Sequence, residues 1–200
     1  WERAELLPMG IAAGGAVERA PASGGLLRLL HVGRIAHLPS YRSLDYILNE
    51  VFPLLREPAL ERVRLRVVGK VESGNPRSDR ITALCERYAG QVELTGFVAD
   101  IDAEFANSDL QVVASTAASG LQTRIVESLA KGLAVLASST AAQGLEEPEN
   151  GKDLYIASTA REFAEVIERL AADPSPVAAM AERGRAFFER KHGREAVAAR

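Results

Sequence analysis

The feature that most constrains this chain is a regular alternation between short apolar runs and longer amphipathic segments, which begins at Leu26. The apolar runs predict six β-strands, at residues 26–32, 63–69, 92–96, 110–115, 134–139 and 154–158. The segments between and after them predict helices at residues 41–55, 80–90, 100–108, 123–132, 160–171 and 177–190. Strands that alternate with helices at this spacing form right-handed crossovers and a parallel sheet. We therefore predict an α/β fold with a doubly wound, mainly parallel, six-stranded sheet.

The chain divides into three predicted parts. Residues 1–25 are rich in Ala and Gly and lack a sustained apolar period, so we interpret them as an interdomain linker at the end of a missing amino-terminal domain. Residues 26–174 are predicted to form a Rossmann-like domain, and residues 175–200 a C-terminal helix. Arg64 and Arg66 alternate with Val63, Leu65 and Val67, which predicts that the arginines lie on one strand face and the apolar residues on the other.

Composition argues against several classes of function. A formal net charge of -3 gives no global electrostatic reason to bind nucleic acid. The single cysteine, Cys85, cannot form an internal disulfide, and no Cys/His cluster has the spacing of a zinc site. No secretory leader or bilayer-spanning run is evident, and phosphate-loop and serine hydrolase motifs are absent. We expect a reducing, cytosolic setting and neither a metal nor a cofactor.

Candidate ligand-binding residues follow the predicted strands, because an open parallel sheet binds ligands beyond the carboxyl ends of its strands. Gly33 and Arg34 follow the first strand, and Gly69 and Lys70 follow the second. Glycines permit close backbone approach, and basic residues supply charge for an anion. His37, in the loop after the first strand, is a lesser candidate for ligand contact. His31, inside that strand, is interpreted as a packed histidine.

The segment STAASGLQTRIVESLAKG, residues 115–132, is the most informative part of the sequence. A loop of small residues leads into a helix with Thr123 and Arg124 in its first turn, and free N–H groups at a helix start favour a phosphate. Arg124 and Glu127 are three residues apart and therefore share a helix face. A guanidinium suits a diphosphate and a carboxylate suits a ribose diol. The alternative is an ordinary surface ion pair between the two.

Residues 26–174 resemble the carboxyl-terminal domain of the large retaining glycosyltransferase family of GT-B architecture, group 1, family 4. The resemblance rests on VGRIAHLPS, VRLRVVGK, VELTGFVAD, SGLQTRIVESLAKG and NGKDLYIAS, which occur in the family's order and spacing. It implies a donor-binding domain of an enzyme that moves a sugar from a nucleoside-diphosphate sugar to an unknown acceptor with retention. The acceptor would be held by an amino-terminal domain, so the isolated chain is expected to be inactive. Peripheral attachment of the full enzyme to the cytoplasmic membrane face is left open.

The resemblance also implies roles for single residues. Gly33 and Arg34 would contact the donor diphosphate, Val98 would frame the nucleobase, and Glu127 would hold the ribose. Arg34 and Arg124 would act in catalysis, because they stabilise charge on the departing diphosphate. The remaining donor-binding residues would come from the loop and first turn before Glu127, namely Gly120, Leu121, Gln122, Thr123 and Arg124.

The sequence departs from the family pattern in two places. Ser119 stands where the family's E-x7-E motif has its first glutamate, and the lysine that usually follows the first strand is missing, with Pro39 near its place. Lys70, Arg42 and Arg124 are the candidates to replace that lysine. The loss of the glutamate leaves a non-catalytic nucleotide-sugar-binding or partner-binding module as the alternative function. A receiver-like regulator ranks last, since the acidic cluster of such domains is absent.

Overall fold

The computed structural model describes residues 15–18, 25–117 and 120–198 of the chain. Its centre is one six-stranded sheet in the order β3-β2-β1-β4-β5-β6, and every pair of neighbouring strands is parallel. The strands are β1 (Leu27–Val32), β2 (Val63–Val68), β3 (Val92–Gly96), β4 (Leu110–Val113), β5 (Ala134–Ser138) and β6 (Tyr155–Ala157). The predicted fold class and all six strands are confirmed, and the sheet is parallel throughout.

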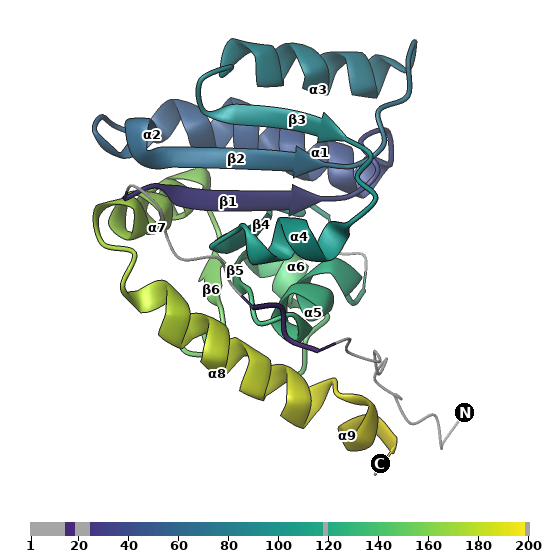
Figure 1. Ribbon diagram of the computed structural model, residues 1–200, viewed down its shortest axis with the longest axis vertical. Helices are drawn as coiled ribbons and strands as arrows, with labels where there is room; N and C mark the ends of the chain where they lie inside the picture. Colours follow the sequence, from purple (N-terminus) through teal and green to yellow (C-terminus); the bar gives the residue numbers. More distant parts are fainter. Residues whose placement is uncertain (1–14, 19–24, 118–119, 199–200) are drawn as a thin grey trace.

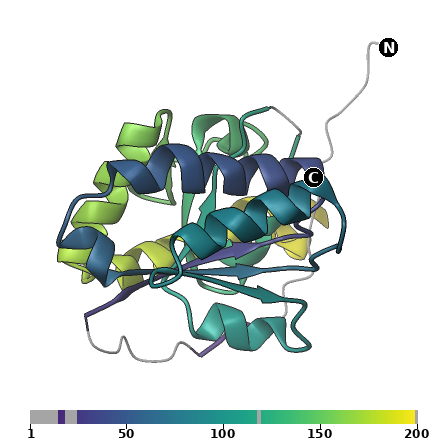
Figure 2. The same ribbon diagram turned by 90° about the horizontal axis from the view of Figure 1, so that it is seen from above.

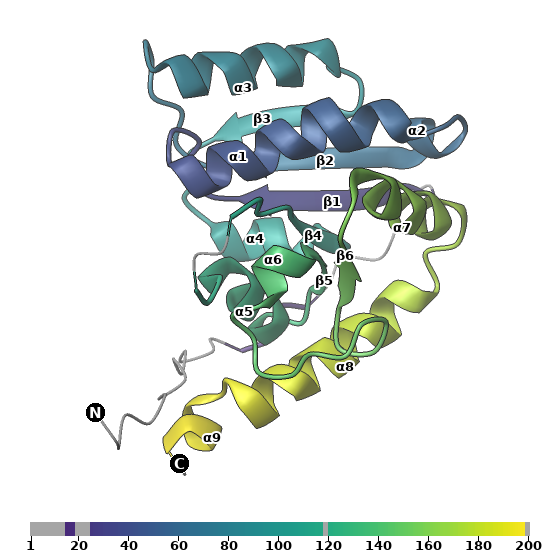
Figure 3. The ribbon, with the colours of Figure 1, turned by 180° about the vertical axis from the view of Figure 1, so that it is seen from behind.

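Helices cover both faces of the sheet (Figures 1 and 3). One face packs against α1 (Leu38–Tyr46), α3 (Pro76–Arg87) and α7 (Ala160–Ala172). The opposite face packs against α4 (Ile101–Ala106) and α5 (Thr123–Ala130). The last long helix, α8 (Pro176–Lys191), contributes Val177 and Met180 to the first core cluster and Phe187 to the second. Figure 2, seen from above, shows the sheet between α1 and α3 on one side and α4 on the other.

The strand sequences explain the two layers, because successive residues of a strand point to opposite faces. Leu29 of β1 belongs to the larger core cluster, whereas Leu30 belongs to the cluster beneath α4. Val112 and Val113 of β4 divide in the same way between the two faces. Full burial of such strands on both faces is what makes their sequences read as nearly continuous apolar runs.

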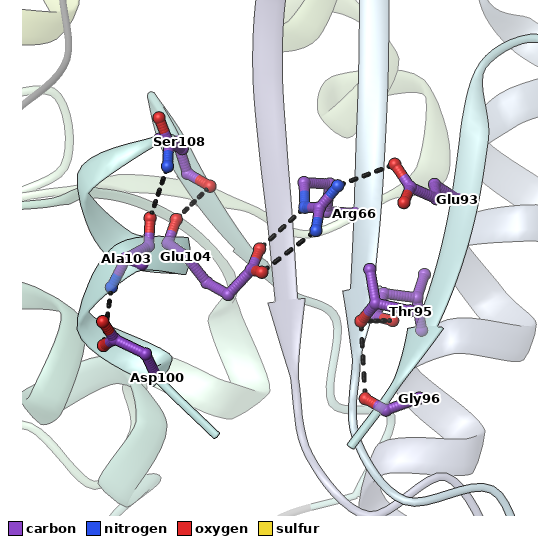
Figure 4. Close-up of polar contacts among 10 residues, drawn as sticks. Arg66, Glu93, Thr95, Gly96, Asp100, Ala103, Glu104 and Ser108 are labelled. Atoms are coloured by element: carbon purple, nitrogen blue, oxygen red, sulfur yellow. Dashed lines mark hydrogen bonds and ion pairs between the residues drawn. The ribbon is translucent and has the colours of Figure 1, made fainter. Parts of the chain in front are cut away.

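The alternating arginines of β2 lie where the sequence predicts them. Leu65 and Val67 are buried in the main core, whereas Arg66 lies on the other face. There its guanidinium donates hydrogen bonds to Glu104 of α4 and to Glu93 of β3, each at 2.7 Å for the shortest contact (Figure 4). Arg66 therefore ties α4 to the sheet.

The predicted helix boundaries need three kinds of correction. The predicted helix at 41–55 starts at Leu38 and continues as a π-helical turn (η1, Ile47–Val51) and a 3-10 turn (η2, Phe52–Leu54). The helix predicted from residue 80 starts at Pro76, after an Asn75 cap that accepts a hydrogen bond from the Arg77 amide. Both starts carry a proline in the first turn, where its missing N–H costs nothing. Three short helices were not predicted: α2 (Ala59–Arg62), α6 (Ser139–Ala142) and α9 (Arg194–Ala198).

The C-terminal helix belongs to the packed domain. Phe187 and Phe188 of α8 are 1% and 2% exposed and join the core cluster of α5 and β5. They are therefore not available to enter a membrane, and no helix in the described part of the chain has the length and apolar content to cross one. The predicted linker, residues 1–25, lies mostly outside the described residues, so its role stays a prediction.

Candidate functional site

The candidate site lies at the carboxyl ends of β1 and β4, where the strand order of the sheet reverses. β1 leads outward to β2 and β3, and β4 leads outward to β5 and β6, so the loops that follow β1 and β4 diverge to opposite faces. Such a switch point leaves a crevice between the two loops. Here it forms a cavity of about 450 Å³ lined by Val32, Gly33, Arg34, His37, Pro39, Ser40, Leu121, Gln122, Thr123, Arg124 and Glu127.

Two glycines bring the loops after β1 and β2 into contact. A Cβ atom on Gly69 would lie 1.8 Å from the carbonyl oxygen of Gly33, and one on Gly33 would lie 2.3 Å from Oγ of Ser40. A side chain at Gly69 would therefore force the two loops apart, whereas one at Gly33 would displace the Ser40 side chain. The glycines therefore set the position of the turn that carries Arg34 into the cavity.

A third glycine supports the loop before α5. A Cβ atom on Gly144 would lie 2.6 Å from the carbonyl oxygen of Gly120 and from Cα of Leu121. The loop after α6 therefore packs directly behind the loop that leads into the cavity. Gly120 itself, at a φ of +70°, does not line the cavity. Ser119 lies outside the described residues.

Arg124 is the inner cation of the site. Its Nε and Nη2 donate to Oε1 of Gln122 at 3.4 and 3.2 Å, and its Nη1 lies 3.4 Å from Nε2 of His31. Burial lowers the pKa of Arg124 to about 10, so the guanidinium stays charged at neutral pH. Within the described residues it forms no ion pair, which leaves a desolvated positive charge at the cavity wall.

Arg34 is the outer cation and is held differently. Its Nη2 donates to Oε1 of Glu72 at 2.8 Å, with the Arg34 side chain 71% exposed. The hydrogen bond from Arg34 lowers the pKa of the Glu72 carboxyl group. Exposed pairs of this kind are weak, so an anion in the cavity can compete with Glu72 for Arg34.

Glu127 contributes a half-buried carboxylate to the same cavity. The ion pair that its spacing from Arg124 allowed is not formed, because Arg124 turns toward Gln122 and His31. Over the ranges 25–117 and 120–198 we find no salt bridge of Glu127. The cavity thus presents a guanidinium and a carboxylate that do not neutralise each other by direct contact.

The structure brings most of the predicted site residues together. Seven line the one cavity, namely Gly33, Arg34, Leu121, Gln122, Thr123, Arg124 and Glu127. Val98 and Gly120 do not, and Val98 instead packs on the buried cluster of Leu30, Val68, Phe105 and Leu133. Of the three candidates to replace the missing lysine, Arg124 lines the cavity and Lys70 and Arg42 do not.

Two neighbours of the site, Ser40 and Glu72, were not predicted from the sequence. His37, a lesser candidate, lines the cavity together with Pro39 and Ser40. Ser40 sits in the first turn of α1, and only the proline beside it marks that turn in the sequence. Glu72 has no sequence signal at all, because its contact with Arg34 spans 38 residues.

Two other hollows, of about 250 and 410 Å³, lie toward the amino ends of the strands. Their principal cations are already paired: Arg56 with Glu168, Arg28 with Asp109, and Arg66 with Glu104. Arg62 lines the first hollow and Arg64 the second, and neither forms an ion pair within the described residues, although Arg64 donates to the carbonyl oxygens of Glu61 and Val63. Both hollows lie away from the carboxyl ends of the strands, where open parallel sheets bind ligands. In the described part of the chain no group of three His, Cys, Asp or Glu residues is arranged to hold a metal ion.

Comparison with known proteins places the chain in a family. The model of the family described as glycosyl transferases group 1 matches residues 27–173. The chain belongs to this family. A comparison with curated protein sequences finds no match.

Solved structures of GT-B glycosyltransferases share the fold of this group 1 domain. Sucrose-phosphate synthase (tll1590) from Thermosynechococcus elongatus superposes with a TM-score of 0.76 at 20% identity, over 98% of this chain and 50% of that one. HepE (Alr3699) from Anabaena, in complex with UDP, gives 0.69 at 20% identity, over 86% of this chain and 46% of that one.

A third similar structure is a single domain. The C-terminal domain of LpcC, a glycosyl transferase group 1 family protein from Francisella tularensis, gives a TM-score of 0.72 at 16% identity, over 92% of this chain and 100% of that one. Against the first structures matched, the chain spans about half of their length, 46%. At these identities the likeness shows the fold alone.

Proposed function

We propose that this chain is the donor-binding domain of a retaining glycosyltransferase, and that the cavity at the switch point binds a nucleoside-diphosphate sugar. The observation that carries the proposal is the desolvated, unneutralised guanidinium of Arg124 beside Glu127 in one cavity of a group 1 domain. The diphosphate would lie against Arg124 and the first turn of α5, and the ribose diol against Glu127. HepE, which has this fold, is solved with UDP, and this supports the assignment.

Transfer builds negative charge on the oxygens of the departing nucleoside diphosphate. Arg124 is already desolvated and oriented before any ligand binds, so stabilising that charge requires little reorganisation. Arg34 would leave Glu72 for the same oxygens. Groups that bind the departing anion more strongly than the intact donor lower the barrier of the chemical step.

The acceptor and the retention of configuration are proposals that rest on the family resemblance. The chain spans 46% of the HepE structure, and we propose that a second domain supplies the acceptor site. The isolated chain would then bind donor without turning it over. We retain the proposal that neither a metal nor a cofactor takes part, since Arg124 and Arg34 offer positive charge at the proposed diphosphate position.

Calorimetric titration of the chain with UDP and GDP tests the proposal. Saturable binding of one nucleotide is expected, weakened by Arg124→Met and by Glu127→Ala. Arg56→Ala is the matched control, because Arg56 is an exposed arginine paired with Glu168 away from the cavity. Binding that survives both cavity substitutions would refute the assigned site. Absence of nucleotide binding would refute a donor site complete within this chain and favour a partner-binding module.

A further inference from the structure

His31 occupies an unusual position for a polar residue, since it lies within β1 and is completely buried. Its Nδ1 is 3.3 Å from the carbonyl oxygen of Val112 on β4, and its Nε2 is 3.4 Å from Nη1 of Arg124 on α5. One imidazole ring therefore joins two strands of the sheet and the inner cation of the cavity.

These two contacts determine the tautomer of the ring. A carbonyl oxygen can only accept a hydrogen bond, so Nδ1 must carry the proton that is shared with Val112. Nε2 then presents a lone pair, and the guanidinium of Arg124 can only donate. The resulting chain runs from Arg124 Nη1–H to His31 Nε2, and from His31 Nδ1–H to the Val112 oxygen.

The other side of the guanidinium is held by Oε1 of Gln122. His31 and Gln122 are both uncharged acceptors, so they fix the plane of the guanidinium without cancelling its charge. An acidic residue in either place would hold Arg124 as firmly but would compete with a bound anion. These contacts use three of the five N–H groups of Arg124, and the other two have no partner in the described part of the chain.

We propose that His31 is a positioning residue, which acts through Arg124 to keep an oriented and fully charged guanidinium at the diphosphate position. The inference rests on the proposed donor site. An apolar residue in β1 could not take this role. Leu or Phe would occupy the same space but would leave Nη1 of Arg124 without a hydrogen-bond acceptor.

Three substitutions separate positioning from packing. His31→Leu removes both contacts, His31→Asn can reach Val112 but not Arg124, and His31→Gln can present an amide oxygen to Arg124. The affinity for UDP or GDP, whichever binds the wild type, is expected to fall about 3- to 10-fold in the Leu and Asn variants, as for loss of one hydrogen bond. The Gln variant should stay nearer to the wild type. Affinity for the matching nucleoside, uridine or guanosine, should not change, because it lacks the diphosphate.

A double-mutant comparison tests the route through Arg124. In an Arg124→Met background, His31→Leu should cause no further loss of nucleotide affinity. An equal loss in both backgrounds would overturn the proposal, as would unchanged affinity of the Leu variant when the wild type binds. If the wild type binds neither UDP nor GDP, the proposed function itself fails and this inference fails with it.

The protonation site of the His31 ring can be measured in the wild-type chain without a ligand, which tests the proposal even if the variants do not fold. Long-range ¹⁵N–¹H correlation spectra of the wild-type chain at pH 7 should show His31 with its proton on Nδ1 and with Nε2 unprotonated. A proton on Nε2 would point an N–H group at the guanidinium. That result would overturn the proposal whatever the nucleotide titrations give.

Discussion

His31 is expected to make the fold less stable as the pH falls from 7 to 5. Burial, and next the positive charge of Arg124, lower the pKa of folded His31 to about 3. In the unfolded chain the ordinary histidine pKa of about 6.5 applies. Between these two values protons bind the unfolded chain and not the folded one. The stability contributed by the neutral imidazole is thus present above pH 6.5 and is lost as the pH falls toward 3.

The size of this loss follows from the two pKa values. Each pH unit between them costs about 1.4 kcal/mol of free energy of unfolding. Integrated from pH 7 to pH 5, the loss is about 2 kcal/mol, against a typical domain stability of about 5–15 kcal/mol. A His31→Gln variant keeps all the other titrating groups. The difference between the two proteins in stability lost from pH 7 to pH 5 therefore reports on His31 alone.

Urea unfolding followed by far-UV circular dichroism at pH 7, 6 and 5 measures this difference. The wild type should lose about 2 kcal/mol more than His31→Gln between pH 7 and pH 5, with equal m-values for the two proteins. An equal loss in both would mean that folded His31 takes up a proton by pH 5. The imidazole could then not be the neutral acceptor of a hydrogen bond from Arg124.

Three further predictions concern glycine packing and the charges of the cavity. Gly69→Ala should lower the free energy of unfolding by about 1–3 kcal/mol, because its Cβ would lie 1.8 Å from a carbonyl oxygen. Gly90→Ala is the control: its Cβ would meet nothing within 4 Å, so its free energy of unfolding should change by no more than about 0.5 kcal/mol. Thermal unfolding of the two variants checks this, and equal midpoints would contradict it. Glu127→Gln should weaken the binding of both UDP and uridine about 10- to 100-fold, since both ligands contain the ribose. If calorimetry shows weaker binding of UDP alone, Glu127 does not hold the ribose. Arg34→Ala and Arg56→Ala should each leave the unfolding midpoint nearly unchanged, but only Arg34→Ala should weaken UDP binding, and equal affinities would remove Arg34 from the site.

The fold was predictable because the strands carry their signal locally. Runs such as 110–113 and 134–138 are buried throughout, so their sequences are almost entirely apolar. Helix starts were less predictable. The starts of α1 and α3 were predicted at residues 41 and 80, close to the first apolar residues of each helix. The helices begin earlier, at Leu38 and Pro76, where Pro39 and the Asn75 cap mark the first turns.

The site was predictable where it follows strand ends and helix starts, as for Gly33 and Arg124. Contacts between side chains that are distant in the sequence could not be predicted, because periodicity indicates which face a residue occupies but not its polar partner. The contact between His31 and Arg124 spans 93 residues. Val98, which follows β3, does not line the cavity and packs against the cluster of Leu30 and Phe105, so its contact with a nucleobase stays a prediction.

The cavity at the switch point forms only when β1 pairs with β4. One wall comes from residues 32–40 and the other from residues 121–127, and these segments meet only when the two central strands align. Arg28 and Asp109 fasten that alignment with hydrogen bonds of 2.8 and 3.0 Å across 81 residues of sequence. Closing so long a loop is an entropically costly part of assembling this sheet. Neither half of the domain contains the cavity alone, so a partly folded chain in which β1 and β4 are not yet paired has no binding site.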